Sequence, residues 1–292
     1  MKGLDMDTCL LADGTKSSVV IQSCQVCGNP NLESVLFLGF MPPVNTMRMI
    51  GQRLKEEPSY PAELLHCSNC DLVQLGLSLD PKILFPPEYP YTSGTTRILR
   101  ENFEDLHQQA CRQLKLKSES LVVDIGSNDG TLLSYFKSHG HRVLGVEPTD
   151  VSKIAVERGI PTEHAYFGGD VASKIKSQYG PAHLVTATNC FAHIENVHAI
   201  VDAIVLLLSD EGVFVSESHY LIGLLDRLQY DTIYHEHLRY YSLNSLKNLL
   251  EMHGLQIFNV SHIPTHGGSI RVYAARAGTY PVLPSVREIL AV

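Results

Sequence analysis

One stretch limits most strongly what this chain can fold into: residues 121–133, with the sequence LVVDIGSNDGTLL. Its first five residues are apolar apart from Asp124, as in a parallel strand that is covered on both faces. Gly126 and Gly130 follow, and glycines permit a tight turn and a close approach of the backbone. A helix start comes next, and its free N–H groups attract polar or anionic ligand groups. The stretch therefore predicts a strand–turn–helix unit of an α/β sheet.

A carboxylate further along the chain favours a nucleoside ligand at this turn. The turn alone is weak evidence, since many α/β proteins close such a unit without binding a ligand. It also differs from the dinucleotide pattern G-x-G-x-x-G, because position 128 is Asn. The next predicted strand, 142–148, brings Glu147 about twenty residues after the turn, where a carboxylate can bind a ribose diol. We therefore expect a nucleoside cofactor.

Composition limits the class of protein. The 292 residues suffice for two domains, and 44% hydrophobic with 18% charged residues is ordinary for a globular chain. A net charge of −8 disfavours a nucleic-acid groove, which usually has a basic face. No apolar run reaches the roughly 18 residues of a membrane span, and the acidic first residues do not resemble a secretory signal. We expect a cytoplasmic protein with a small-molecule ligand and neither nucleic acid nor membrane as partner; the oligomeric state stays open.

Two C-x-x-C pairs predict a zinc site. The pairs are Cys24 with Cys27 and Cys67 with Cys70, and four thiolates make a closed, structural site. The alternative is a redox C-x-x-C, but two pairs without a thioredoxin-like pattern favour metal. The 39 residues between the pairs exceed a minimal zinc ribbon, so we expect a small zinc-held module. The remaining cysteines are expected to be plain thiols: Cys9, Cys111 and Cys190.

A loop rich in proline and tyrosine, residues 85–94, precedes a predicted helix over 95–116. Such a loop is either a linker or a lid over a site. Its tyrosines, Tyr89 and Tyr91, are either packing residues or present a hydroxyl to a substrate.

From residue 120 onward strands and helices alternate, which predicts a mostly parallel sheet with right-handed crossovers. Two late strands, 255–262 and 269–275, are expected to close the sheet as an antiparallel pair. In such sheets ligands bind beyond the carboxyl ends of the strands. Six polar residues are expected at that edge: Asp124, Asn128, Glu147, Asn189, His193 and Glu217.

The unbroken run Tyr-His-Glu-His at 234–237 allows three interpretations. A metal site is one, although two histidines and one glutamate on a single element are short of ligands. A polar network in the core is the second. The third is an acid/base cluster, because a histidine beside a carboxylate is suited to removing a proton.

Four motifs behind the paired cysteines resemble the zinc-containing class I S-adenosylmethionine-dependent C-methyltransferases, whose characterised type is the sugar 3-C-methyltransferase of deoxysugar biosynthesis. They are residues 124–133, 191–194, 233–242 and 266–271. The resemblance implies an α/β fold, a class I methyltransferase (Rossmann-like) sheet with an N-terminal zinc-binding module. The implied segments are a zinc module (1–85), a loop and linking helix (86–118), a cofactor-binding domain (119–277), and a tail or the start of a further domain (278–292).

The resemblance also implies a reaction, methylation of C3 in a nucleotide-linked 4-keto-deoxysugar. The ketone acidifies the C3 proton, a base removes it, and the enolate attacks the methyl group of the donor. His237 is then the general base, and Tyr234 and Glu236 are its polar partners. His193 would lie near the sugar and the enolate oxygen, and Tyr89 or Tyr91 would face the substrate.

The implied cofactors are S-adenosylmethionine and a structural Zn²⁺. The residues expected around S-adenosylmethionine are Asp124, Gly126, Asn128, Asp129, Gly130, Glu147 and Asn189. Two alternatives remain. One is a zinc-ribbon rRNA base methyltransferase, which the acidic charge disfavours. The other is a catalytically inactive, cofactor-binding remnant or assembly subunit, suggested by a chain shorter than is usual in the family.

Overall fold

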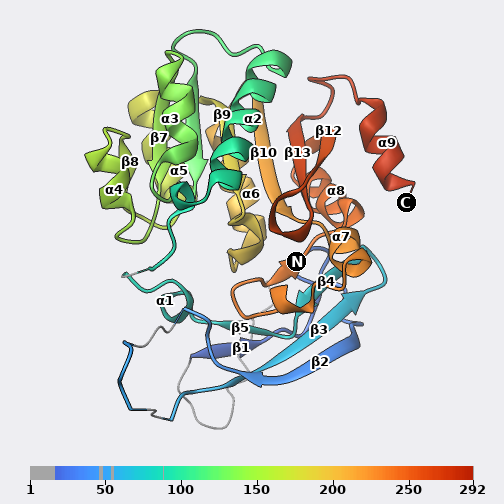
Figure 1. The fold of residues 1–292 in the computed structure, drawn as a ribbon. Coiled ribbons are helices and arrows are strands. Elements are labelled where there is room, and N and C mark those ends of the chain that lie inside the picture. The colour runs from blue at the N-terminus through green and yellow to red at the C-terminus, as the bar shows by residue number, and fades with distance from the viewer. Residues whose placement is uncertain (1–16, 46–48, 54–55, 88, 292) are drawn as a thin grey trace.

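The structure is a computed structural model that describes residues 17–45, 49–53, 56–87 and 89–291, so Cys9 and the first part of the predicted zinc module lie outside the described residues. Two sheets organise the described chain, a large α/β sheet and a smaller antiparallel one that lies beneath it in the view of Figure 1. Among the described residues, no helix is both long and apolar enough to span a bilayer.

The large sheet has seven strands in the order β12-β13-β10-β9-β6-β7-β8. Its strands are β6 (Leu121–Ile125), β7 (Arg142–Val146), β8 (Thr162–Glu163), β9 (Ala182–Thr188), β10 (Leu208–His219), β12 (Leu255–Ile263) and β13 (Ser269–Arg276). The pairings among β6 to β10 are parallel, and β13 runs antiparallel to both β10 and β12. The predicted parallel sheet and its antiparallel closing pair are therefore confirmed.

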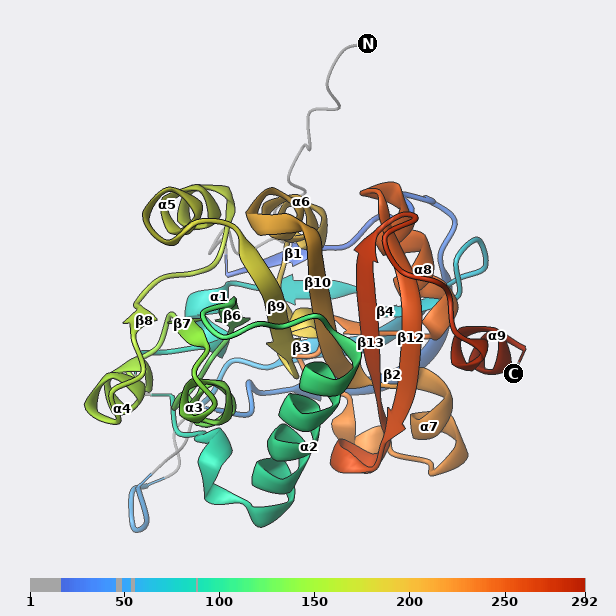
Figure 2. The ribbon, with the colours of Figure 1, turned by 90° about the horizontal axis from the view of Figure 1, so that it is seen from above.

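Helices cover both faces of this sheet (Figure 2). One face carries α2 (Arg97–Gln113), α3 (Thr131–Ser138) and α4 (Ser152–Glu157); the other carries α5 (Gly169–Tyr179), α6 (Val197–Leu207) and α8 (Leu243–Met252). The strands between them are apolar because both of their faces are buried. Neither β8 nor α5 was predicted, since β8 has two residues and α5 buries only Ala172 and Ile175.

The smaller sheet has the order β11-β4-β3-β2. Its strands are β2 (Glu33–Met41), β3 (Tyr60–Cys67), β4 (Leu72–Leu75) and β11 (Arg239–Tyr240), and a separate pair joins β1 (Ser18–Val20) to β5 (Leu77–Leu79). β11 comes from the second half of the chain, directly after the 234–237 run. The buried residues around the cysteine pairs also share one apolar cluster with α6 and α8. The zinc module is thus built into the rest of the fold.

Shorter elements complete the described chain. They are α1 (Pro81–Leu84), α7 (Leu221–Asp226), α9 (Pro284–Leu290) and the 3₁₀ turns Ser93–Thr95, Phe191–His193, Tyr230–Thr232 and Thr265–Gly267. Several of these turns follow strands of the large sheet, and they position the side chains of the site described below.

Candidate active site

A cavity of about 840 Å³ opens beyond the carboxyl ends of β6, β7, β9 and β10. This volume is in the upper part of the usual range for ligand sites. Ten of the predicted site residues line it: Tyr89, Tyr91, Gly126, Asn128, Glu147, Asn189, His193, Tyr234, Glu236 and His237. Residues separated by more than a hundred positions therefore meet at one sheet edge, as the alternating pattern predicts.

The glycine turn after β6 is shaped by close packing. Gly126 has φ +67°, and a Cβ at this position would lie 2.9 Å from the Cβ of Cys190. Asn128 also has a positive φ, and its backbone N–H donates to Oε2 of Glu147 at 3.1 Å. The other oxygen of Glu147 accepts from the N–H and the hydroxyl of Thr149. The carboxylate at the end of β7 therefore fixes the turn after β6.

Three predicted cofactor residues do not line the cavity. Asp124 is buried beneath the turn, where it accepts a hydrogen bond from the Thr186 hydroxyl at 2.6 Å. Asp129 accepts hydrogen bonds from the N–H and the hydroxyl of Thr131, the first residue of α3, at 3.2 and 2.7 Å. Gly130 has φ +76° and packs against Ala155. These residues support the turn from behind.

The residues at the turn fit a bound nucleoside cofactor. The buried Oδ1 of Asn189 has no hydrogen-bond partner among the described residues, although a buried polar atom normally has one. Gly126 presents backbone without a side chain to the cavity, and the carboxylate of Glu147 faces the same cavity. The unpaired Oδ1 of Asn189 could accept a hydrogen bond from an amine of the ligand. The turn at Gly126 could lie against an extended chain, and the Glu147 carboxylate could bind a ribose diol.

The tyrosine loop lies against this turn. Asn128 accepts a hydrogen bond from the N–H of Ser93 at 2.8 Å and donates one to the carbonyl of Tyr91 at 3.1 Å. The Asp129 carboxylate accepts from the N–H of Gly94 at 3.0 Å. Of the two interpretations of this loop, these contacts favour a cover over the site. Burial raises the pKa of Tyr91 above its usual value, so its phenol is neutral at physiological pH.

Four histidines surround the opposite part of the cavity. The ring of His237 lies 5.0 Å from that of His193 and 4.6 Å from that of His219, and His266 lies 5.6 Å from His219. His219 and His266 were not predicted as site residues. The signal for His219 was its position directly after the strand predicted over 212–218, and His266 stands in one of the quoted motifs.

The hydrogen bonding of His237 fixes its tautomer. Its Nδ1 lies 2.7 Å from the carbonyl oxygen of Thr232, which can only accept, so Nδ1 carries the proton and Nε2 keeps its lone pair. Burial and the neighbouring His193 lower the pKa of His237 to about 3. The imidazole is therefore neutral at physiological pH, as a general base has to be.

Glu236 precedes His237 in the chain and is almost fully buried. Its Oε1 accepts a hydrogen bond from the side-chain amide of Asn45, and its Oε2 accepts one from the Tyr89 hydroxyl at 3.3 Å. Burial raises the pKa of Glu236 to about 7. Burial and this carboxylate both raise the pKa of Tyr89 and of Tyr234, so both phenols remain neutral donors. No feature of the sequence indicated Asn45, which comes from the zinc module.

Glu217 does not contribute to the cavity, contrary to the prediction from its place near the end of β10. Its side chain lies against α2, where it accepts hydrogen bonds from Nε of Arg271 at 2.5 Å and from the side-chain amide of Asn102 at 2.7 Å. Arg271 stands directly opposite on β13. Glu217 lies two residues before the end of β10 at His219, so it pairs with Arg271 inside the sheet and does not reach the cavity.

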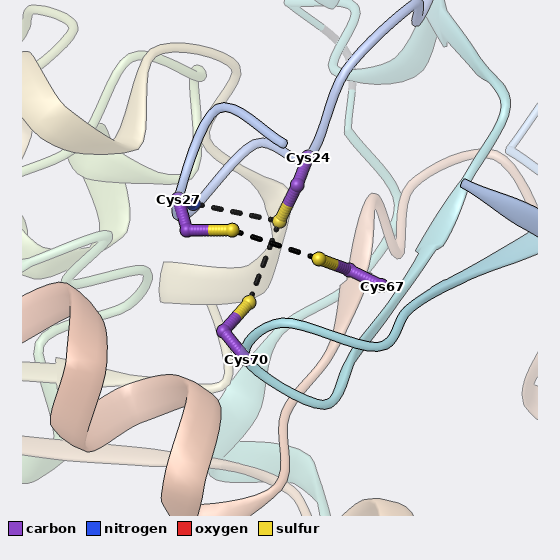
Figure 3. Close-up of side chains that lie close together, drawn as sticks. All are labelled: Cys24, Cys27, Cys67 and Cys70. Atoms are coloured by element: carbon purple, nitrogen blue, oxygen red, sulfur yellow. Dashed lines mark hydrogen bonds between the residues drawn. The ribbon is translucent and has the colours of Figure 1, made fainter. Parts of the chain in front are cut away.

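The four predicted zinc ligands come together as Figure 3 shows. The Sγ atoms of Cys24 and Cys70 are 3.5 Å apart, those of Cys27 and Cys67 are 3.6 Å apart, and all four lie within 4.8 Å of one another. Four thiolates at about 2.3 Å from one zinc ion would stand roughly 3.8 Å apart. The site fits a tetrahedral structural Zn²⁺. Among the described residues, these cysteines form the one cluster of three or more potential metal ligands. The interpretation of residues 234–237 as a metal site therefore gains no support.

Two family models match the chain. Residues 96–260, more than half of the chain, match the model described as "Methyltransferase domain". Residues 24–85, which include all four cysteine ligands, match the one described as "Putative zinc binding domain". The two matches agree with the predicted fold class and with both predicted cofactors.

The chain is also similar to a curated protein and to solved structures. The C-methyltransferase NovU from Streptomyces niveus is 35% identical over 273 residues, which are 93% of this chain and 65% of NovU. This chain therefore spans about two thirds of the length of that relative. Among solved structures, a "putative O-methyltransferase" from Nostoc punctiforme superposes with a TM-score of 0.50 and 14% identity over 66% of this chain and 62% of its own. The PH0226 protein of Pyrococcus horikoshii gives 0.49 and 14% over 67% and 98%. The Nostoc structure supports the fold alone.

Proposed function

The chain belongs to the methyltransferase-domain family with a class I fold, and we propose that it transfers a methyl group from S-adenosylmethionine to carbon. As acceptor we propose a nucleotide-linked 4-keto-deoxysugar, methylated through an enolate in the cytoplasm. The similarity to a protein named C-methyltransferase supports the choice of carbon. The observation that carries the proposal is His237, a neutral imidazole on the cavity wall whose Nδ1–H is held by Thr232.

The residues around the turn would hold the cofactor. When bound, S-adenosylmethionine supplies an electrophilic methyl group on a sulfonium. Gly126 and Asn128 would border its methionine part, Asn189 would accept a hydrogen bond in the site, and Glu147 would bind the ribose diol. Asp124, Asp129 and Gly130 would act indirectly, by supporting the turn.

His237 starts the reaction on the acceptor. Its Nε2 takes the proton from the carbon next to the ketone, and the electron pair of that C–H bond forms an enolate. The resulting imidazolium and enolate stabilise each other in a site that excludes most water. His193 lies beside His237 and is also neutral, because burial lowers its pKa to about 3, so it can donate an N–H to the enolate oxygen. The enolate carbon would then take the methyl group, while the electron pair of the broken carbon–sulfur bond stays on a neutral thioether, and the proton would leave through His237.

The charge of the cavity favours this pair of ligands. Among the described residues that line it there is no lysine or arginine, while Glu147, Glu195, Asp231 and Glu236 contribute carboxyl groups. An acidic wall attracts a sulfonium and tolerates an uncharged sugar ring, whereas it repels phosphates. A diphosphate would therefore lie outside the cavity, and the RNA alternative gains no support from these residues.

Product analysis tests the proposed function. The full chain would be incubated with S-adenosylmethionine carrying a ¹³C-labelled methyl group and a panel of nucleotide-linked 4-keto-deoxysugars. We expect a labelled methyl group on the carbon adjacent to the ketone, identified by its carbon–carbon coupling in NMR. A label on oxygen would contradict the enolate route. Cofactor binding by calorimetry without turnover of any of these sugars would favour the inactive-remnant alternative.

A further inference from the structure

One side chain of the zinc module, that of Asn45, contacts a residue of the proposed active site. Asn45 follows β2, four residues after its last residue. Its amide donates to Oε1 of Glu236, 191 positions further along the chain. The hydroxyl of Tyr89 donates to the other oxygen, Oε2. Each oxygen of this buried carboxylate therefore has one neutral donor, and the donors come from two different segments.

A second contact from the zinc module holds the adjacent residue. The Nε2–H of His235 donates to the carbonyl oxygen of Pro61 at 3.2 Å, and the ring of Tyr60 packs edge-on against the His235 ring at 5.9 Å. Tyr60 and Pro61 begin β3, the strand that pairs with β2. The zinc module therefore contacts two consecutive residues of the 234–237 run, His235 and Glu236.

We propose that Asn45 is a positioning residue of the active site: its amide fixes the orientation of the Glu236 carboxylate, which in turn holds the Tyr89 hydroxyl in the cavity that His237 also lines. This inference rests on the proposed function, since it assigns a role within that reaction. It also assigns the zinc module a role in the reaction, because the two cysteine pairs flank the β2–β3 hairpin that carries Asn45 and Pro61.

A neutral amide suits this task better than a cation. Lysine or arginine would form an ion pair and hold the carboxyl ionised throughout the physiological range. Burial instead raises the pKa of Glu236 to about 7, and the hydrogen bonds from Tyr89 and Asn45 counteract part of that rise. The titratable groups facing it are the phenols of Tyr89 and Tyr234 and the adjacent His237, and all three are neutral near that pH. Glu236 can therefore change its protonation state during a turnover while Asn45 keeps its orientation.

Two substitutions test this inference. Asn45→Ala removes the donor, and Asn45→Asp is isosteric but places a second carboxylate beside Glu236. The titration of the Glu236 carboxyl would be followed by ¹³C NMR of glutamate-labelled protein, with Glu236→Gln to assign the signal. We expect the titration midpoint to rise by about one pH unit in Asn45→Ala and further in Asn45→Asp. The acid limb of the pH profile of kcat should move by the same amount, while KM for S-adenosylmethionine stays unchanged.

The matched control is Ser34→Ala. Ser34 lies on β2 of the same module, and its hydroxyl donates to the Glu63 carboxylate at 2.6 Å on the exposed surface. It should leave the Glu236 titration, the zinc content and the pH profile as in the unsubstituted protein. If Asn45→Ala fails to fold, the isosteric Asn45→Asp decides.

Each outcome separates this inference from the proposed function. An unchanged Glu236 titration in both Asn45 variants would overturn the positioning role, whatever the activity. A shift in the titration midpoint of Glu236 without a matching shift in the pH profile of kcat would also overturn the positioning role. If the titration midpoint of Glu236 shifts but the protein methylates no keto sugar, the proposed function is contradicted. Only the hydrogen bond between Asn45 and Glu236 is then supported.

Discussion

Replacing Gly126 by alanine should damage the fold more than the same change at another glycine with a similar backbone. Gly126 and Gly254 have φ values of +67° and +76°, so alanine is strained at either position, by about 1–2 kcal/mol. Around Gly254 a new Cβ would meet nothing within 4 Å. At Gly126 it would lie 2.9 Å from the Cβ and 3.0 Å from the Sγ of Cys190. A Cβ cannot rotate away, so the backbone itself has to move.

The difference between the two variants isolates this clash. Overpacking of this kind costs about 1–3 kcal/mol, so Gly126→Ala should lower the free energy of unfolding by about 2–5 kcal/mol and Gly254→Ala by about 1–2 kcal/mol. Denaturant titration would measure both, and calorimetry would measure S-adenosylmethionine affinity, which should fall only in Gly126→Ala. Equal destabilisation in the two variants, or unchanged cofactor affinity in Gly126→Ala, would refute the role given to this turn.

Three further predictions follow from particular residues. Removing zinc with a chelator should expose the buried Cys24 and Cys67 to thiol reagents and unfold the module; absence of zinc from purified protein by metal analysis would contradict the site. Because burial raises the pKa of Asp124 to about 7, the folded state holds a proton that the unfolded chain releases near pH 4, so this carboxyl's contribution to stability falls as the pH rises between these values. Asp124→Asn should flatten that part of the pH dependence of unfolding, and an unchanged slope would count against it. Arg271→Met should destabilise by about 3–5 kcal/mol, since it leaves the buried Glu217 without its charged partner; unfolding by urea should show this loss, and a change below 1 kcal/mol would refute it.

Much of the site could be predicted from the sequence, because the pattern of strands and helices determines where the strand ends lie. Gly126, Glu147 and Asn189 follow three strands of one parallel sheet, so their meeting at one edge could be predicted. The pattern does not determine the direction of each side chain. Asp129 stands in the same turn as Asn128, yet its carboxylate bonds to Thr131 at the start of α3 while Asn128 faces the cavity.

The contribution of the zinc module could not be predicted, for a different reason. Asn45 and Glu236 are 191 positions apart and share no repeating pattern, and they meet because β2 and β11, the strands next to them in the chain, belong to one small sheet. Cys24, Cys27, Cys67 and Cys70 are also distant in sequence, but a metal demands a fixed ligand set, so their spacing alone revealed them.

The central claim is that His237 removes a proton from the carbon to be methylated, and deuterium exchange tests it most directly. The protein would be incubated in D₂O with a nucleotide-linked 4-keto-deoxysugar, and the C3 proton would be followed by NMR. We predict exchange in the unsubstituted protein and a loss of at least a hundredfold in His237→Asn, with S-adenosylmethionine affinity nearly intact. Exchange at an unchanged rate in His237→Asn would contradict the assignment of the base.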